Sequence, residues 1–184
     1  MTNDATRWLD ITEPGWTRVE LPFPSTSSRF VTGDTTGRRL SVRFYRRDAD
    51  GALMLKARCG PDAQGPPGHA HGGSMAALLD EAMGAAAWLS GHPVLAAELN
   101  VTFKRMLPLE TACVVEAEVV EVDDRKIHAS SVLRDPAGGI VYCTGRALLI
   151  ELDERQLADL ATLTMEMLDR ERREAGEPDQ GKGS

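Results

Sequence analysis

The sequence predicts an α+β domain in which one long helix is buried against an antiparallel sheet. The first observation is a run of apolar side chains at helical spacing, Met75, Leu78, Leu79, Ala82, Met83, Ala86 and Ala87. These residues form a single apolar stripe with the 3.6-residue period of a helix. The second is a series of four long strand-like stretches with short polar or glycine-rich breaks, a pattern typical of an antiparallel meander.

Length and composition favour one domain with extensions at both ends. The 184 residues are 42% hydrophobic and carry a formal charge of −7, which suits a sizeable core and argues against general nucleic-acid binding. The longest apolar run is too short to cross a bilayer, so we expect no membrane partner. Cys59, Cys113 and Cys143 form no C-x-x-C pair. In the absence of a secretory leader, we expect reduced thiols in a cytoplasmic protein.

The first half of the chain predicts an N-terminal extension and a hairpin. Residues 1–29 combine tryptophans with three prolines, and we expect them to pack on the domain, with a short helix near Trp8; the alternative is a lid over a substrate tunnel. Residues 40–46 and 52–59 alternate in polarity around the turn at 48–51, which indicates two paired strands.

The second half predicts the helix, four strands and a second helix. The Gly-Pro-Pro-Gly stretch at 65–68 cannot continue a helix, and the helical pattern then runs over 72–89. The strand-like stretches are 94–106, 112–122, 126–134 and 140–152. We expect a C-terminal helix over 153–175, capped by Asp153, and a disordered tail over 176–184.

Asp80 is the candidate catalytic residue on the long helix. Its neighbours at helical spacing, Gly73, Ala76, Ala77 and Gly84, are small and leave room for a ligand or a second helix. A carboxylate on the apolar side of a helix is costly to bury unless it is paired or used in catalysis. The alternative is a surface acid, as we expect for the adjacent Glu81. The free N–H groups at the glycine-rich start of the helix suit a negatively charged oxygen.

Residues 65–84, G-P-P-G-H-A-H-G-G-S-M-A-A-L-L-D-E-A-M-G, resemble the signature of hotdog-fold acyl-CoA thioesterases of the phenylacetate-degradation (PaaI) type. That signature reads H-G-G, six residues, Asp, and Gly four positions later. Residues 97–108 and 30–44 are also similar to segments of this family. The resemblance implies a hotdog domain over 30–152, in which a curved antiparallel sheet wraps around one long central helix.

The resemblance also implies roles for individual residues. Asp80 would act as general base or nucleophile, the Gly72 N–H would bind the oxyanion, and His71 would fix the loop. Many members carry an Asn at the position of Gly65 and some carry a Ser or Thr in the region of 96–98; both are absent here, and Gln64 is a candidate substitute for the Asn. The candidate substrate-binding residues are Gly73 and, for the CoA phosphates, Lys104, Arg105, Arg125 and Lys126.

The resulting hypothesis is an acyl-CoA thioesterase that needs no metal or redox cofactor, with coenzyme A as part of its substrate. Gly72 and Asp80 are eight residues apart on one helix, about 12 Å along its axis. We therefore expect a homodimer or homotetramer whose active site is shared between subunits. The alternatives are a hydratase or dehydratase on the same fold and a non-catalytic acyl-CoA binding protein. His69 and His71 resemble two metal ligands, but the sequence offers no convincing third or fourth.

Overall fold

The computed structural model describes residues 4–22, 26 and 28–174. Its elements, in chain order, are α1 (Asp4–Leu9), β1 (Trp16–Arg18), β2 (Leu40–Arg47), β3 (Leu53–Cys59), the 3-10 helix η1 (Pro61–Ala63), α2 (Gly72–Leu89), β4 (Val94–Phe103), β5 (Ala112–Asp123), β6 (Lys126–Arg134), β7 (Val141–Glu151) and α3 (Glu154–Glu174). The chain divides into two compact units, residues 1–151 and residues 152–184.

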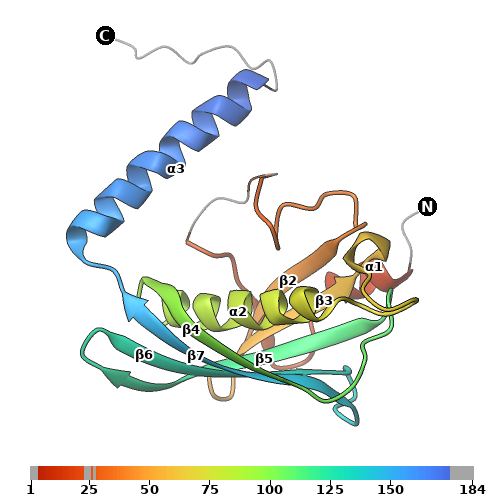
Figure 1. Cartoon of the computed structure of the whole chain (residues 1–184). Helices are drawn as coiled ribbons and strands as arrows, with labels where there is room; N and C mark the ends of the chain where they lie inside the picture. The colour runs from red at the N-terminus through yellow and green to blue at the C-terminus, as the bar shows by residue number, and fades with distance from the viewer. Residues whose placement is uncertain (1–3, 23–25, 27, 175–184) are drawn as a thin grey trace. The chain divides into compact units, whose positions relative to one another are not determined.

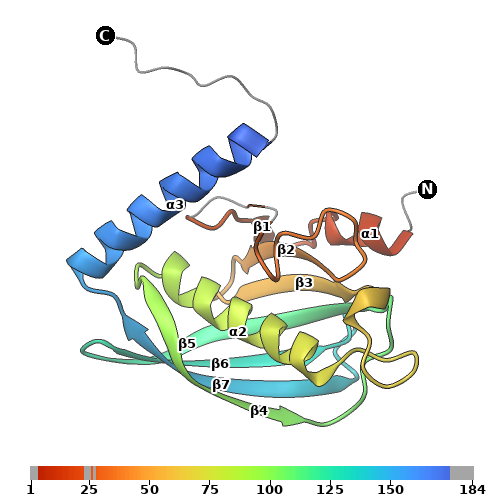
Figure 2. The ribbon, with the colours of Figure 1, turned by 45° about the horizontal axis from the view of Figure 1, so that its top comes forward.

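The first unit is a seven-stranded antiparallel sheet with α2 along one face (Figures 1 and 2). The strand order is β1-β2-β3-β5-β6-β7-β4. The predicted meander is therefore correct only for β5, β6 and β7, because β4 pairs with β7 and lies at an edge. The connection from β4 to β5 is too long for a tight hairpin and contains Pro108, so β5 is free to pair with β3 instead.

The helix α2 begins and ends where the sequence predicts. His71 caps its first turn with a side-chain hydrogen bond, and Ser90 ends it, followed by Gly91 at a φ of +91°. All seven residues of the predicted apolar stripe are buried, together with Ala85. The predicted stripe is therefore the buried side of the helix.

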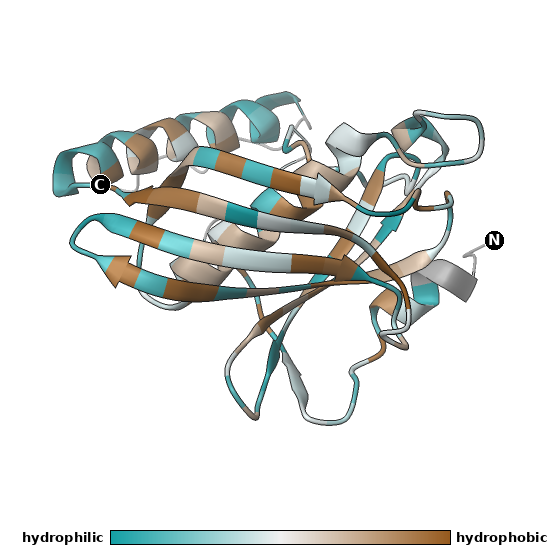
Figure 3. Cartoon of the chain, turned by 60° about the horizontal axis from the view of Figure 1, so that its bottom comes forward, coloured by the Kyte–Doolittle hydropathy of each residue, from teal (hydrophilic) through white to brown (hydrophobic). Residues whose placement is uncertain are grey.

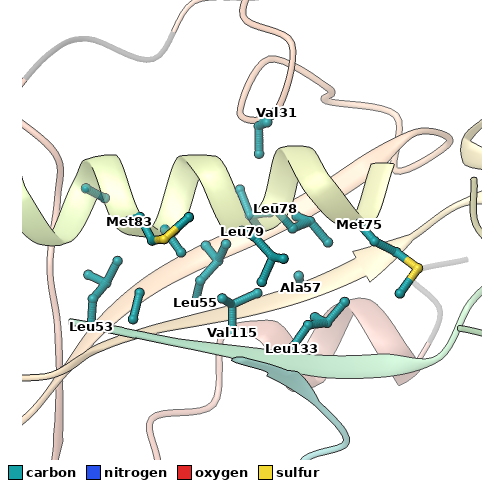
Figure 4. Close-up of a cluster of buried hydrophobic side chains, with 14 of the residues drawn as sticks. Val31, Leu53, Leu55, Ala57, Met75, Leu78, Leu79, Met83, Val115 and Leu133 are labelled. Carbon is teal, nitrogen blue, oxygen red and sulfur yellow. The ribbon is translucent and has the colours of Figure 1, made fainter. Parts of the chain in front are cut away.

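The main core lies between α2 and the concave face of the sheet. Leu55, Val115 and Leu133 pack from the strands below α2, whereas Val31 packs from the opposite side of the helix (Figure 4). The loop that carries Val31 therefore covers part of the face of α2 that the sheet does not reach.

The outer face of the sheet carries a second, smaller cluster. Successive side chains of a strand point to opposite faces, so Tyr45, Met54 and Val114 lie on the face away from α2, where Trp8 and Trp16 of the N-terminal segment pack against them. Figure 3 views the sheet from this outer side, where apolar and polar bands alternate along the strands. Residues 1–3, 23–25 and 27 of the predicted N-terminal extension lie outside the described residues.

The second unit contains the helix α3, which occupies the range expected for a C-terminal helix. Its first turn is closed by a reciprocal pair of hydrogen bonds: the Gln156 N–H donates to the Asp153 carboxylate, and the Asp153 N–H donates to the Gln156 side chain. This is a capping box, with Asp153 as the predicted cap. Residue 175 and the predicted disordered tail, 176–184, lie outside the described residues.

Candidate functional site

The segment from Ala63 to His71 forms a closed loop at the start of α2. The Gly65 N–H donates to the His69 carbonyl (3.0 Å), and the His71 N–H donates to the Ala63 carbonyl (2.8 Å). A second set of bonds ties the loop to the chain between β4 and β5: Ala70 N–H donates to Leu107 O (2.8 Å) and Leu109 N–H to Gly68 O (3.0 Å). The position of the helix start is therefore set from two sides.

His71 uses its side chain to organise the first turn of α2. Its Nδ1 accepts a hydrogen bond of 2.8 Å from the Gly73 N–H. An imidazole nitrogen that accepts in this way carries no proton, so the neutral ring has its proton on Nε2. The arrangement agrees with the expected loop-fixing role of His71, and it engages the Gly73 N–H, which leaves that group unavailable to a ligand.

The Gly72 N–H has no hydrogen-bond acceptor among the described residues. As the first residue of α2, Gly72 is too early in the helix to donate within it. The ring of Phe103, at the end of β4, covers this position closely, because a Cβ at Gly72 would lie 3.3 Å from its Cζ. One backbone donor at the positive end of a helix is thus left open beside an exposed aromatic ring.

Asp80 is half-buried two turns further along α2. Burial raises the pKa of its carboxyl group above the ordinary value, since the charged form loses hydration. No hydrogen bond or ion pair to this carboxylate is found among the described residues. Such a group is a suitable general base, because a raised pKa increases its affinity for a proton.

Glu81 is not the fully exposed surface acid that we expected. It is half-buried, and desolvation raises its pKa; the charge of Asp80 adds to this rise, and the charge of Arg29 opposes it. The sequence did not indicate this environment because Arg29 belongs to a loop more than forty residues earlier in the chain.

The side chain of Gln64 lies within the loop and supports its shape. Its Oε1 accepts a hydrogen bond of 3.0 Å from the Gly68 N–H. Gly65, where many relatives carry Asn, is packed so closely that a Cβ would lie 2.8 Å from the His71 Cα. An Asn at position 65 would therefore require a different loop conformation, and the Gln64 side chain is committed to the loop.

The four candidate phosphate-binding cations fall into two groups at opposite ends of β4. Lys104 and Arg105 follow Phe103 directly and are exposed. Arg125 and Lys126 lie at the β5–β6 turn, where the Arg125 guanidinium donates to the Glu151 carbonyl (2.8 and 3.1 Å). Because the ten residues of β4 extend about 30 Å, one chain does not bring the two groups together.

The turn that carries Arg125 and Lys126 also contains two acids. Asp123, Asp124 and Ile150 line a surface hollow of about 390 Å³ together with these two cations. The adjacent carboxylates offset the positive charge that a phosphate would require.

One strip of α2, made of small residues and Asp80, is only partly covered by the rest of the described chain. We call Gly73, Ala76, Ala77, Asp80 and Gly84 the open flank of α2; none of them is fully buried. A Cβ at Gly84 would have no neighbour within 4 Å. The edge strand β4 and the turn after it are also exposed, with large apolar side chains at Leu95 (59%), Leu99 (41%), Phe103 (53%) and Met106 (63%).

Residues 4–22, 26 and 28–174 contain neither a metal-binding cluster nor a membrane-spanning helix. In this part of the chain, no group of three or more His, Cys, Asp or Glu side chains is arranged to hold a metal ion. None of its helices has the length and apolar content of a membrane span. Cys59, Cys113 and Cys143 are all free and buried.

Sequence reasoning did not identify two features next to the site. No sequence pattern indicated that Phe103 lies against Gly72, because this contact depends on how the edge strand β4 passes the helix. The other feature is Glu110, which binds the buried Arg58 and adopts a φ of +65°. A positive φ at a glutamate has no sequence signature.

Comparison with known proteins supports this architecture. The family model of the thioesterase superfamily matches residues 67–141. The human acyl-coenzyme A thioesterase THEM5 is 33% identical over 89 residues, which cover 48% of this chain and 36% of THEM5. The bovine acyl-coenzyme A thioesterase THEM4 is 30% identical over 135 residues, 73% of this chain and 56% of THEM4. The chain thus spans only about a third to a half of the length of these curated relatives.

Solved structures agree. The crystal structure of a thioesterase superfamily protein, 30% identical, superposes with a TM-score of 0.56 over 60% of this chain and 53% of that chain. The Escherichia coli PaaI protein, 13% identical, has the same fold, with a TM-score of 0.54 over 62% of this chain and 80% of its own. The predicted resemblance to the hotdog-fold thioesterases is therefore confirmed, and the first unit has the hotdog fold of the thioesterase-superfamily structures.

Proposed function

We propose that this chain hydrolyses acyl-CoA thioesters, with Asp80 as the general base and the Gly72 N–H as the oxyanion donor. The observation that carries the proposal is the combination of a half-buried carboxylate without a partner and an open N–H on the same helix. The names of the relatives THEM4 and THEM5 support the same activity.

In the proposed reaction, water attacks the thioester carbonyl carbon while the Asp80 carboxylate accepts a proton from that water. The carbonyl oxygen becomes an oxyanion, and the Gly72 N–H donates a hydrogen bond to it. The tetrahedral intermediate then breaks its C–S bond, and the CoA thiolate leaves with the proton held by Asp80. Neither a metal nor a redox cofactor takes part, and His71 acts only on the loop.

A second route uses Asp80 as nucleophile. Its carboxylate would attack the carbonyl carbon, expel the CoA thiolate and form a mixed anhydride, which water then hydrolyses. Single-turnover hydrolysis in H₂¹⁸O, followed by mass spectrometry of the Asp80 peptide, tests the second route. Label in the carboxylate requires an anhydride that water opens at its aspartyl carbonyl, whereas label only in the released acid is produced by direct attack of water or by water that opens the anhydride at its acyl carbonyl.

We propose that the active site is shared between two copies of the chain. The Gly72 N–H and the Asp80 carboxylate are about 12 Å apart along the axis of α2, whereas both must lie about 3 Å from the reacting atoms. A two-fold dimer with antiparallel α2 helices brings Asp80 of one copy to Gly72 of the other, twice.

The open flank of α2 and the exposed edge of the sheet support this dimer. The small side chains of the open flank allow a second helix to approach closely, and Gly84 faces unoccupied space. Among the described residues, no strand pairs with the outer edge of β4, and its exposed leucines leave apolar surface in contact with water. A second copy paired at β4 would cover both surfaces; dimer and tetramer remain the two assemblies to test.

We further propose where coenzyme A binds. Lys104 and Arg105 follow Phe103, which contacts the Gly72 end of α2, and they are the favoured contacts for the CoA phosphates in the same chain. Gly73 lines the path by which the substrate reaches Gly72. An antiparallel dimer would bring Arg125 and Lys126 of one copy toward Lys104 and Arg105 of the other. The three unpaired thiols support a reducing compartment, the cytoplasm.

The test is thiol release from a panel of acyl-CoA thioesters, measured with DTNB. A thioesterase releases free CoA with at least one acyl group, whereas a hydratase or dehydratase alters the acyl chain without releasing thiol. A binding protein gives saturable binding in calorimetry and no product. If none of the panel yields thiol above the uncatalysed rate, the proposed activity is wrong.

A further inference from the structure

Glu110 and Arg58 form an ion pair at residues 107–110, the segment that contacts the loop before α2. Arg58, on β3, is almost fully buried, with a side chain 6% exposed, and its Nη1 donates to the Glu110 carboxylate. Its Nη2 donates to the Gly37 carbonyl (2.9 Å). The Arg58 Nε is buried without an acceptor among the described residues, so Glu110 supplies the compensating charge.

The backbone of Glu110 adopts an unusual conformation at this contact. Its φ of +65° lies in the left-handed region, which a residue with a long side chain rarely adopts without compensation. The Glu110 N–H also donates to the Cys59 carbonyl (2.8 Å), one residue after Arg58. Glu110 is therefore attached to the end of β3 through both its side chain and its backbone.

The segment held in this way is the one that contacts the loop. Leu107 accepts from the Ala70 N–H, Pro108 forms a β-bridge with His69, and the Leu109 N–H donates to Gly68. Residues 68–70 immediately precede His71, the cap of α2, and Gly72. A displaced 107–110 segment would therefore move the backbone donor of Gly72.

We propose that Arg58 and Glu110 are positioning residues for the proposed thioesterase reaction, which set the position of the Gly72 N–H through the 107–110 segment. This inference rests on the proposed function. The pair lies behind the loop and touches neither Gly72 nor Asp80, so its loss should impair transition-state stabilisation while leaving the binding of the CoA portion of the substrate intact. A misplacement of about 1 Å at a reacting centre can reduce the rate about a hundredfold.

Two variants separate the effect of losing the ion pair from the effect of the backbone conformation at residue 110. Glu110→Gly removes the carboxylate but favours the positive φ, and Glu110→Gln keeps the shape while removing the charge. The matched control is Glu116→Gln on β5. The Glu116 carboxylate accepts from Arg47 (2.7 Å) and Arg134 (3.3 Å), and the side chain is 32% exposed, against 43% for Glu110. The control loses a comparable ion-pair network away from the loop.

The measurements are kcat and KM well below the melting temperature, and hydrogen–deuterium exchange of peptides covering 64–71. We expect both Glu110 variants to lower kcat about 10- to 100-fold with KM changed less than about threefold, and to accelerate exchange at 68–70. Glu116→Gln should change neither quantity. A kcat within about twofold of wild type in Glu110→Gly, or an equal loss in Glu116→Gln, would overturn the inference.

The exchange measurement separates this inference from the proposed function. A wild-type chain that releases no thiol refutes the thioesterase activity. In that case, unchanged exchange at 68–70 in the Glu110 variants would refute the role of the ion pair in holding the loop, and accelerated exchange would support it.

Discussion

Lys56 on the outer face of the sheet and Asp80 on the open flank of α2 are both charged side chains withdrawn from water. The Lys56 side chain is 0% exposed, and its Nζ donates to Trp8 O (3.3 Å), Ile11 O (2.7 Å) and the Glu13 carboxylate (2.7 Å). The rings of Trp8, Trp16 and Tyr45 lie 4.3, 5.7 and 5.5 Å from it. The ammonium group thus has three acceptors for its three protons.

Asp80 is less buried than Lys56, yet its carboxylate has no comparable set of partners in the described chain. The difference shows that burial of a charge does not by itself mark a functional site. A buried charge with all its partners holds elements together, as Lys56 attaches the N-terminal segment to β3. A buried charge without partners remains available to a substrate, a water molecule or a second subunit.

The largest expected effect is at Asp80. Replacing it in Asp80→Asn should lower kcat about a hundredfold or more, because the amide cannot accept the proton of the attacking water. Circular dichroism and binding of a non-hydrolysable acyl-CoA analogue should be unchanged. Hydrolysis at a near wild-type rate would make Asp80 structural and remove the contrast with Lys56.

The second prediction tests whether the missing partner of Asp80 is the other subunit. Asp80→Asn and a Gly72→Val variant, each inactive alone, are mixed and refolded together. Heterodimers make up about half of a random mixture and contain one intact site of two, so activity should return to about a quarter of wild type. Mass spectrometry provides the control: heterodimers that form and stay inactive would refute the shared site.

The third prediction concerns the compensated charge. Lys56→Met should lower the free energy of unfolding by about 1–3 kcal/mol, because it leaves buried acceptors without a donor. The kcat of the folded enzyme should remain unchanged. The matched control is Arg46→Met, an exposed cation on the neighbouring β2, and urea unfolding of all three proteins measures the difference. If Lys56→Met has normal stability but a low kcat, Lys56 acts in the reaction and not in holding the fold together.

The fourth prediction follows from the raised pKa of Asp80. Between its ordinary value of 3.8 and its raised value, the folded chain binds more protons than the unfolded chain. The contribution of Asp80 to the free energy of unfolding therefore decreases as the pH rises through that window. At neutral pH the ionised carboxylate still destabilises the folded chain. Asp80→Asn should melt at a higher temperature than wild type at pH 7, and the difference should shrink as the pH falls toward 4. If Asp80→Asn is less stable than wild type at pH 7, the Asp80 carboxylate has stabilising partners and the prediction is wrong.

The smallest expected effect is at Gln64. Its Oε1 supports the loop through one hydrogen bond to Gly68, so Gln64→Ala should lower kcat by about 2- to 10-fold, the equivalent of one net hydrogen bond. Gln156→Ala, which removes the side-chain acceptor of the Asp153 N–H at the start of α3, is the control for a lost amide. A loss as large as that of Asp80→Asn would instead assign Gln64 a direct role in the chemistry.

The sequence by itself determined the helix, most of the strands and the candidate acid. The apolar stripe from Met75 to Ala87 and the alternation in the strands are local patterns, and the burial of both in the structure follows them. The glycine-rich start of α2 and Asp80 were also readable, because they lie within ten residues of one another.

Only the tertiary structure decided which segments meet. β4 pairs with β7 rather than β5, Phe103 covers Gly72, Glu81 is shielded from water on α2, and Lys56 is enclosed by residues more than forty positions earlier. Each of these depends on contacts between residues far apart in the chain. Local periodicity sets which face of an element is buried, but the length of a connection and the packing of distant side chains decide what lies against that face.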